Sequence, residues 1–409
     1  MTEESIQKTR AYPGLPLGQA LFYRFVWFFW QSTVARFYRV NGRNTQAIPR
    51  EGPFLLLANH SAALDPFWVG SPMWRPLRFM AATSLLAIPF AGKFLMMMGA
   101  FPKQKFVKDA DSMATLYELY NRGLGVVIFP EGDRTWDGRL NPVPPGIGRL
   151  IKRMGARVVY ARMTSAHLAQ PRWADHLRWV PLDIEYEGPF EYGPELSADE
   201  IAEEVKRRIA TVPRRDQARL AWGWRIADGL QRYLWACPAC FQVDGLVVER
   251  ADGSVLRCTA CRCGWRLDLD NNLRGLDGGQ DLDVRRAADL ITDHFGTPPV
   301  FDPARTDATG VVMQDSTAQI VELQRGQQPT PVAEGIPRLS TTRISVVGED
   351  GQERWGEDLA DLDAFTIEVK HQVFLRARGK LWRLEIPQDV RLRWGLVGIA
   401  WYRHLRPLR

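Results

Sequence analysis

The sequence predicts an α/β domain, followed by a small segment of paired cysteines and a β-rich C-terminal domain. Residues 46–215 alternate apolar, strand-like runs with helical patterns, which is typical of a layered α/β architecture. Four cysteines form two C-x2-C pairs between positions 237 and 261. Residues 311–386 alternate in short strands and turns, and a helix-compatible segment, Pro387–His404, follows them.

Residues 1–45 are expected to form a flexible leader and an amphipathic arm that faces a membrane. Leu21–Trp30 is rich in aromatic residues and would suit a lipid interface as a helix, with the nearby arginines at the headgroups. Packing on the protein's own core is the alternative. Only eleven uncharged residues separate Arg24 from Arg36, fewer than the about 20 that span a bilayer, and no signal peptide is visible. We therefore expect a peripheral or monotopic protein on the cytoplasmic face of a membrane.

Strands and helices are expected to alternate through residues 46–215. The expected strands are Phe54–Ala58, Leu77–Ala81, Val126–Phe129, Arg157–Met163 and Val180–Tyr186. The expected helices are Asp109–Arg122, Gly146–Met154 and Ala198–Thr211, the last with a capping box at Ser197 and Glu200. The apolar run Leu85–Met98 predicts a buried helix or, alternatively, the wall of an apolar channel.

The first of these strands leads into a candidate catalytic pair, His60 and Asp65. Reactive side chains at strand ends line the clefts of α/β enzymes. Residues five apart point away from each other on a continuous helix. We therefore place His60 in the turn before a helix that Asp65 caps and Pro66 begins. The carboxylate can then orient the imidazole as a general base. A loop histidine next to a plain helix cap is the alternative for an isolated H-x4-D pattern.

Two more motifs follow this pair. Gly99–Lys105 reads G-A-F-P-K-Q-K, and Phe129–Arg134 reads F-P-E-G-D-R. Together with N-H-S-A-A-L-D at positions 59–65, they resemble in order and spacing three blocks of the glycerolipid acyltransferase family, the H-x4-D enzymes. The resemblance covers roughly residues 20–215 and implies an acyltransferase-type mixed sheet flanked by helices.

The resemblance also implies a reaction. A fatty acyl group would move from a thioester donor, acyl-CoA or acyl carrier protein, to a hydroxyl of a glycerophospholipid precursor, with 1-acylglycerol-3-phosphate as the first choice. His60, oriented by Asp65, would remove the hydroxyl proton, and no cofactor is needed for this chemistry. The residues that would bind the acceptor are Glu131, Gly132 and Arg134, with Lys103 and Lys105 across the cleft; Arg134 would take the phosphate.

Two positions depart from the family pattern. Lys105 stands where the family usually has Arg, and a lysine lacks the planar fork that grips a phosphate. Asp133 stands where lysophosphatidate acyltransferases commonly have Thr, and a carboxylate there would repel a nearby phosphate. Acylation of another lipid acceptor is therefore one alternative. A non-catalytic, membrane-associated lipid-binding protein is the other, although the intact His60–Asp65 pair argues against it.

The cysteines predict a structural zinc site. Cys237, Cys240, Cys258 and Cys261 form two C-x2-C turns separated by seventeen residues, which is the spacing of a zinc ribbon. Residues 247–257 are expected to form a hairpin between them, and Cys263 is left over. The net charge of +6 fits a membrane surface, a phosphate ligand or nucleic acid. Because the ribbon holds few basic residues, nucleic acid is the weaker interpretation.

The expected order of domains follows from these features. It comprises the arm at 1–45, the acyltransferase domain at 46–215, a connecting helix and zinc ribbon at 216–296, and a β-rich domain with a terminal helix at 306–409. The connecting helix is expected within the Trp-rich residues 214–235, and a further helix at Asp283–Phe295. The linker Gly296–Thr306 would mark the last boundary. Short strands followed by one helix are similar in outline to the pleckstrin-homology-like architecture, from which lipid binding does not follow.

Overall fold

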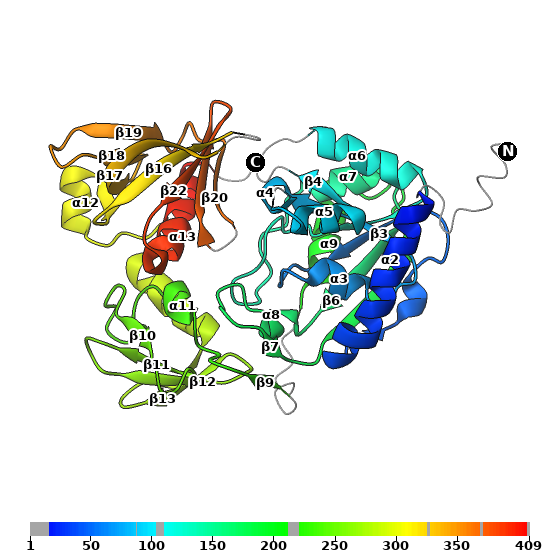
Figure 1. Cartoon of the computed structure of the whole chain (residues 1–409), viewed down its shortest axis with the longest axis horizontal. Coiled ribbons are helices and arrows are strands. Elements are labelled where there is room, and N and C mark those ends of the chain that lie inside the picture. The colour runs from blue at the N-terminus through cyan, green and yellow to red at the C-terminus, as the bar shows by residue number, and fades with distance from the viewer. Residues whose placement is uncertain are drawn as a thin grey trace. The chain divides into compact units, whose positions relative to one another are not determined.

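The structure is a computed structural model of the 409-residue chain (Figure 1). It describes residues 16–86, 88–103, 110–211, 221–324, 328–368 and 371–406. The chain divides into two compact units. Unit 1 comprises Met1–Arg172 and His176–Trp224, and unit 2 comprises Trp173–Asp175 and Arg225–Arg409.

Unit 1 is an α/β layer structure. Its helices are α2 (Leu17–Trp30, continued by a π-helical turn at Gln31–Ala35), a 3-10 turn at Thr45–Ala47, α3 (Asp65–Gly70), α4 (Thr83–Leu86), α5 (Ala91–Met97), α6 (Ala110–Asn121), α7 (Gly146–Met154), α8 (Ala166–Ala169) and α9 (Ala198–Ile209). Its strands are β1 (Asn41–Arg43), β2 (Phe54–Ala58), β3 (Leu77–Ala82), β4 (Ala100–Lys103), β5 (Gly125–Ile128), β6 (Val158–Met163), β7 (Arg178–Trp179), β8 (Asp183–Phe190) and β9 (Trp222–Gly223).

Seven of these strands form one mixed sheet in the order β1-β8-β6-β2-β5-β3-β4. Only β6 and β8 pair in antiparallel fashion; all other neighbours in the sheet are parallel. The predicted mixed sheet is confirmed, and α7 begins and ends where the sequence predicts. The strand expected at Val180–Tyr186 instead begins at Asp183. The capping box of α9 is also confirmed, since Ser197 and Glu200 bond each other's backbone amides.

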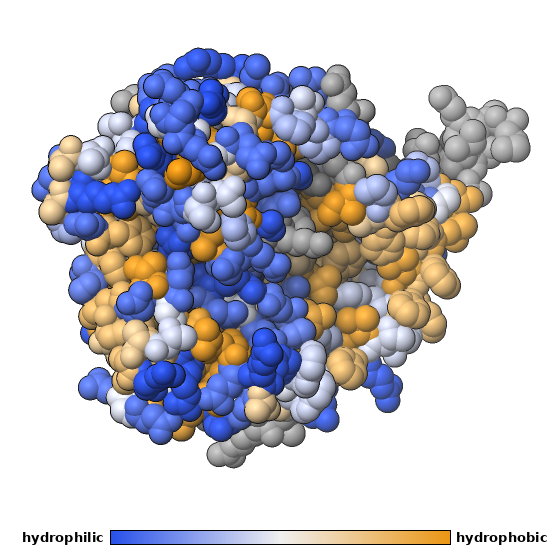
Figure 2. Space-filling view, turned by 60° about the vertical axis from the view of Figure 1, so that its left-hand side comes forward, coloured by the Kyte–Doolittle hydropathy of each residue, from blue (hydrophilic) through white to orange (hydrophobic). Residues whose placement is uncertain are grey.

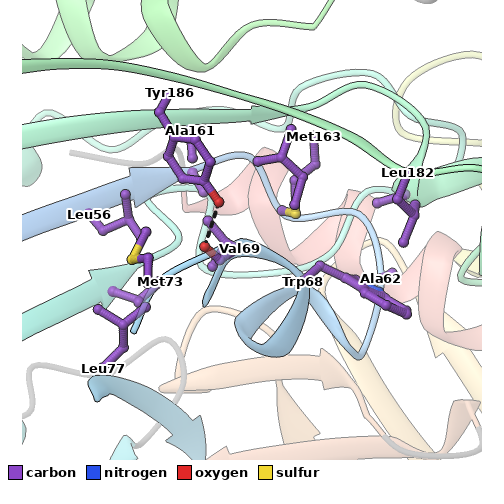
Figure 3. Packing of buried hydrophobic residues seen from close by; sticks show 14 of the residues in the cluster. Leu56, Ala62, Trp68, Val69, Met73, Leu77, Ala161, Met163, Leu182 and Tyr186 are labelled. Atoms are coloured by element: carbon purple, nitrogen blue, oxygen red, sulfur yellow. Dashed lines mark hydrogen bonds between the residues drawn. The ribbon is translucent and has the colours of Figure 1, made fainter. Parts of the chain in front are cut away.

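Helices cover both faces of this sheet. The central strand β2 is buried along its whole length, as a parallel strand covered on both sides must be. Leu55 and Leu57 pack among residues of α6, α7 and α9. Leu56 points to the other face, toward α3, as Figure 3 shows. There the Tyr186 hydroxyl donates a 2.7 Å hydrogen bond to the carbonyl of Val69, which ties α3 to strand β8.

Helix α2 has one packed face, in agreement with the alternative expected for the arm, and one exposed apolar face; its contact with a membrane stays a prediction, and residues 1–15 of the arm lie outside the described residues. The Trp30 ring lies 4.8 Å from that of Trp68, and buried Tyr23 also faces inward. In contrast, Phe25, Phe28 and Phe29 are 69%, 67% and 57% exposed. Figure 2 shows apolar colour gathered on the right-hand side of the view, the side that carries α2. Among the described residues, no helix combines the length and apolar character needed to cross a bilayer.

The run Leu85–Met98 is not the single buried helix that the sequence predicts. It is divided between α4 and α5, because Phe90, directly after Pro89, adopts a positive φ of 62° that a right-handed helix cannot hold. Phe90 is 87% exposed, and Met96 and Met97 also reach the surface. Helix α5 packs beside α2, with the rings of Phe22 and Phe94 6.2 Å apart. The apolar residues of the run therefore extend the exposed face of α2.

Unit 2 holds two sheets. Its helices are α10 (Leu230–Tyr233), α11 (Val284–Phe295), α12 (Pro303–Thr309) and α13 (Gln388–Leu405). The first sheet, in the order β10-β11-β12-β13-β14, consists of β10 (Leu246–Val248), β11 (Val255–Cys258), β12 (Gly264–Leu267), β13 (Asn272–Leu276) and β14 (Leu282–Asp283). The second consists of β15 (Val311–Gln314), β16 (Ala318–Leu323), β17 (Thr330–Ser340), β18 (Arg343–Val347), β19 (Glu353–Asp358), β20 (Ala364–Ile367), β21 (Val373–Ala377) and β22 (Lys380–Glu385).

The hairpin predicted at 247–257 is confirmed as β10 and β11, within a larger five-stranded sheet. In the second sheet the strand order is β19-β18-β17-β16-β22-β21-β20, with β15 beside β17. Helix α13 packs on this sheet and confirms the predicted terminal helix. Its buried Arg393 pairs with Asp244, in the turn before β10, at 2.8 Å and with Asp315 at 3.0 Å. The pair with Asp244 joins the two parts of unit 2, and the pair with Asp315 fixes Arg393 within the second part.

The prediction of a connecting helix at 214–235 is wrong for residues 221–235, the part of this segment that the structure describes. Residues 214–220 lie outside the described residues, and 221–235 hold only the two-residue strand β9 and the four-residue helix α10. Strand β9 pairs with β7, so that Trp222 lies opposite Trp179. This pairing joins segments more than forty positions apart, and no local pattern indicates it.

Candidate active site and candidate metal centre

Two neighbouring parallel strands bring the first and third motifs together. His60 follows β2 and Glu131 follows β5, and these strands pair in register from Phe54–Gly125 to Leu57–Ile128. The backbone amide of His60 donates to Glu131 Oε1 at 2.6 Å. The backbone amide of Thr135 donates in turn to the carbonyl of His60 at 2.9 Å. The loop after β5 therefore fixes the backbone of the histidine from both sides.

His60 and Asp65 form the expected pair. The Nδ1 atom of His60 lies 2.9 Å from Asp65 Oδ2. Since a carboxylate can only accept, Nδ1 carries the proton and Nε2 keeps its lone pair. No described residue forms a hydrogen bond with Nε2. The imidazole is thus held in the tautomer that a general base requires.

Asp65 acts differently from the helix cap that the sequence predicts. Leu64 occupies the N-cap position of α3, and Asp65 is already its first residue. The carboxylate turns back and accepts the backbone amides of Ser61 and Ala62 at 2.5 and 2.8 Å. Asp65 is fully buried. It therefore shapes the loop that carries His60 as well as orienting the ring.

The surroundings of His60 favour its neutral form. Burial lowers the pKa of His60 below its usual range, against the opposing effect of Asp65, and the charge of Arg134 lowers it further. The ring also stacks on Phe129, with centroids 4.3 Å apart and planes 20° from parallel. A neutral, fixed imidazole at neutral pH is ready to accept a proton.

This pKa direction predicts the pH dependence of the acyl transfer that the three motifs lead us to expect. Rate should rise with pH as His60 loses its proton, and because the pKa is lowered, this rise should be centred below pH 6.5. Measuring kcat at saturating acceptor between pH 5 and 8 tests it. Burial raises the pKa of Glu131 to about 7, so Glu131→Gln is the control: the rise below 6.5 should remain in that variant. A rise centred above pH 7 in both proteins would contradict the assignment.

Asn59 anchors the other side of the loop. Its side-chain amide donates to the carbonyl of Met163 at 3.1 Å and accepts that residue's amide at 2.8 Å. The side chain thereby continues the pairing of β2 with β6 one position beyond the end of β2. The sequence contains the residue within the motif, but its partner lies 104 positions away.

Glu131 and Gly132 build the turn that follows β5. Glu131 is 7% exposed, and its second oxygen accepts the backbone amide of Asn141 at 2.7 Å. Both carboxylate oxygens thus hold backbone amides, so Glu131 positions the loop and the histidine. Gly132 has a φ of 71° with open space around its Cα, and its amide closes the turn onto the carbonyl of Phe129 at 3.0 Å. Glycine is favoured at position 132 because the backbone has a positive φ there, and not because a side chain would lack room.

Arg134 is a partly buried cation beside the histidine. Among the described residues, its guanidinium has no hydrogen-bond or ion-pair partner. Burial and the nearby Arg172 lower its pKa to about 10, so it keeps its charge at neutral pH. An unpaired, partly desolvated guanidinium next to a base offers a site for an anionic group of a substrate.

Asp133 does not act as the free carboxylate that the sequence suggests. It pairs with Arg172 at 2.7 Å, and the same guanidinium nitrogen donates to the carbonyl of Arg134 at 2.7 Å. Arg172 is itself buried and lies 4.0 Å from the centre of the Trp136 ring. Its charge neutralises Asp133 beside the site. Sequence reasoning missed Arg172, which lies 38 positions beyond Arg134 and outside any motif.

Of the two lysines of the second motif, the structure describes Lys103 but not Lys105. Lys103 ends β4 and pairs in register with Ala82 of β3. It thus lies at the same carboxyl edge of the sheet as His60, separated from β2 by β5 and β3. Lys105 lies outside the described residues. The structure therefore brings His60, Asp65, Glu131, Gly132 and Arg134 into one site and places Lys103 farther along its edge.

An apolar pocket lies in the layer of helices that contains α3. It is narrow and lies between α2, α3 and β3, with Pro66 and Phe67 on one wall and Trp27 and Trp30 on another. Pro66 directly follows Asp65 in the chain.

The four cysteines of the two C-x2-C turns come together as predicted. Their sulfur atoms all lie within 4.8 Å of one another, with Cys237–Cys261 at 3.8 Å and Cys240–Cys258 at 3.7 Å. A tetrahedral zinc ion with Zn–S bonds of about 2.3 Å requires sulfur atoms about 3.8 Å apart. The donor set therefore fits a tetrahedral ion. Cys263 is not part of the cluster.

Comparison with known proteins agrees with the motifs. The family model described as Acyltransferase matches residues 39–163. The chloroplast 1-acyl-sn-glycerol-3-phosphate acyltransferase of Arabidopsis thaliana is 29% identical over 142 residues, which are 34% of this chain and 40% of that protein. The enzyme of the same name from Borreliella burgdorferi is 26% identical over 117 residues, 28% of this chain and 47% of that protein. The chain thus spans less than half the length of these curated relatives.

A solved structure is also similar in part. The crystal structure of the 1-acyl-sn-glycerophosphate acyltransferase from Thermotoga maritima covers 47% of this chain and 84% of its own, with 17% sequence identity and a TM-score of 0.38.

Proposed function

We propose that the chain is an O-acyltransferase whose acceptor is a phosphate-bearing glycerolipid such as 1-acylglycerol-3-phosphate, because residues 39–163 match the Acyltransferase family model and the chain is similar there to 1-acyl-sn-glycerol-3-phosphate acyltransferases. The donor would be a fatty acyl thioester, acyl-CoA or acyl carrier protein. The single observation that carries the proposal is the His60–Asp65 pair, held beside the unpaired cation of Arg134.

In the proposed reaction, Nε2 of His60 accepts the proton of the acceptor hydroxyl as the oxygen attacks the thioester carbonyl. The tetrahedral intermediate then collapses, the C–S bond breaks, and the leaving thiolate takes the proton back from His60. Asp65 stabilises the imidazolium that forms between these steps, as its 2.9 Å contact with Nδ1 allows. The products are the new ester and a free thiol, and His60 returns neutral.

Arg134 would bind the phosphate of the acceptor, and this gives a first test. Arg134→Ala should raise the KM for 1-acylglycerol-3-phosphate about 10- to 100-fold, since a hydrogen bond to a charged group contributes about 1.5–3 kcal/mol. The change in kcat should be smaller. Arg139→Ala is the matched control, because this nearby arginine is 46% exposed and pairs with Asp137. Equal effects of the two substitutions would remove Arg134 from the acceptor site.

The pairing of Asp133 with Arg172 bears on the choice of acceptor. The alternative of a phosphate-free acceptor was suggested by the carboxylate at position 133. Since Arg172 neutralises that carboxylate at 2.7 Å, a phosphate at Arg134 meets no unpaired negative charge there. This supports the phosphate-bearing acceptor.

We further propose that the exposed apolar face of α2 and α5 rests on a membrane surface, with the acyl chains near the pocket between α2 and α3. This face is defined by Leu21, Phe25, Phe28, Phe29, Phe90, Met96 and Met97. A contiguous exposed patch of this kind marks a contact surface, and aromatic side chains suit the lipid interface. The protein would bind the cytoplasmic face of this membrane.

A variant of this face tests the membrane proposal. Replacing Phe25, Phe28 and Phe29 together with Ser should lower sedimentation with phospholipid vesicles at least tenfold, because these side chains are exposed and their loss leaves the core intact. Val247→Ser, which changes an exposed apolar residue of unit 2, is the control and should have no effect. Unchanged sedimentation of the triple variant would show that this face does not bind lipid.

In unit 2, Cys237, Cys240, Cys258 and Cys261 would hold a structural zinc ion. The ion would supply folding free energy to the small five-stranded sheet and take no part in acyl transfer. The sheet of β15–β22 with α13 would be a pleckstrin-homology-like module, a proposal about fold alone.

A further inference from the structure

The eight-stranded sheet of unit 2 contains a pocket that the acyltransferase proposal does not use. It measures about 290 Å³ and opens at one end of the sheet, between β16, β17, β19 and the hairpin of β21 and β22. Its lining comprises Glu322, Val332, Trp355, Glu357, Arg378, Lys380 and Trp382. We propose that this pocket binds a zwitterionic head group, with an ammonium group against the tryptophans and Glu357 and a phosphate at Arg378 and Lys380.

The two tryptophans form the apolar corner of the pocket. Their ring centroids are 5.6 Å apart and their planes are inclined by 68°. Trp382 is almost fully buried, and Trp355 is partly buried against the same core. Near-perpendicular aromatic faces are the arrangement that attracts alkylammonium groups, because the ring faces carry partial negative charge.

Glu357 adds a buried carboxylate to this corner. It lies on the same face of β19 as Trp355 and pairs in register with Ile344, a residue of the core. Its side chain is only 10% exposed, and its Oε2 is buried with no hydrogen-bond partner among the described residues. A buried carboxylate oxygen without a hydrogen bond is costly, because the Arg378 guanidinium 3.5 Å away compensates it poorly, and a cation bound closer would lower that cost.

The cations nearest to the acidic groups are weakly held. Arg378 is 70% exposed and lies 3.5 Å from Glu357 Oε2, beyond good hydrogen-bond geometry, while it also reaches Asp361 at 3.3 Å. Lys380 is 57% exposed and lies 3.5 Å from Glu322. Both side chains can swing outward when a ligand ammonium takes their place. They would then meet the phosphate that follows the ammonium in a head group of the phosphocholine type.

Glu322 supplies a second carboxylate beside the two tryptophans, because its strand pairs directly with that of Trp382. Glu322 of β16 pairs with Trp382 of β22, so the two side chains share one face of the sheet. The inner end of the pocket is therefore acidic and aromatic, and its rim is basic. This order of charges matches a ligand whose ammonium enters first and whose phosphate stays at the surface.

Calorimetric titration of the full chain tests the proposal with choline, phosphocholine and inorganic phosphate as probes. Phosphocholine should bind more tightly than choline, and phosphate alone should bind least. Glu357→Gln and Trp355→Leu should each weaken choline and phosphocholine binding at least tenfold. Arg378→Gln should weaken phosphocholine but not choline, because it removes only the phosphate contact. Glu353→Gln, on the same strand but 42% exposed, is the matched control.

Vesicles distinguish the source of the head group. If the pocket binds lipid, Glu357→Gln lowers sedimentation with phosphatidylcholine vesicles; if it binds a soluble molecule, only the titration changes. No binding of choline or phosphocholine to the folded wild-type chain would overturn the proposal. Equal binding by the wild type and Glu357→Gln would overturn it as well. Acyl transfer at His60 is read separately, so failure here leaves the proposed reaction untouched.

Discussion

His60→Ala should reduce acyl transfer by about 100- to 10,000-fold, the contribution that a positioned general base commonly makes. In the His60 ring, Nδ1 lies 2.9 Å from Asp65 Oδ2, and no described residue forms a hydrogen bond with Nε2. Nε2 is therefore the atom that can accept the proton. The fold should be kept, since the backbone of His60 is fixed by Glu131 and Thr135 through its amide and carbonyl. Steady-state rates with purified protein measure the loss, and circular dichroism checks the fold.

Asp65→Asn should also lower the rate of acyl transfer, for two reasons. The amide loses the charge that stabilises the imidazolium, and it accepts the amides of Ser61 and Ala62 less strongly. The pKa of His60 should fall further, because Asp65 raises it in the wild type. A variant that retains wild-type rates would show that the pair is structural only.

Removing the metal should have the second large effect. We expect one zinc per chain, and chelation or Cys258→Ser should unfold the sheet of β10–β14. Cys258 is buried at the end of β11, and a sheet this small has little core of its own. Hydrogen exchange of residues 237–283 should rise, while transfer at His60 continues. Elemental analysis and exchange mass spectrometry measure the two outcomes.

Cys263→Ser is the control for the metal prediction, because Cys263 lies outside the cluster of four sulfur atoms. It should keep both zinc content and protection from exchange. A metal-free chain whose cysteine-rich sheet stays protected would refute the zinc assignment. Equal loss of zinc from the Cys263 and Cys258 variants would refute the proposed ligand set.

Features that depend on local sequence were predicted well. The strand at Phe54–Ala58, the helix at Gly146–Met154 and the pairing of His60 with Asp65 follow from periodicity, capping and short spacing. The cysteine cluster follows from two C-x2-C turns for the same reason. Each of these features is set by residues close together in the chain.

Features that depend on distant partners were not predictable from one sequence. Glu131 holds the backbone of His60 only because β2 and β5 are neighbours in the sheet. Arg172 neutralises Asp133 across a separation of 39 positions. The segment before Trp235 has helical composition, yet β9 pairs with β7 instead. In each case a tertiary contact decided what local propensity left open.

The most direct test is a single assay of the purified full chain. The protein is incubated with an acyl-CoA and 1-acylglycerol-3-phosphate in phospholipid vesicles, in parallel with His60→Ala, and the lipids are identified by mass spectrometry. We expect the wild type to form diacylglycerol-3-phosphate and one equivalent of free CoA, and the variant to form them at no more than about one hundredth of that rate. Equal formation of this product by both proteins, or none by the folded wild type with either acyl-CoA or acyl carrier protein as donor, would contradict it.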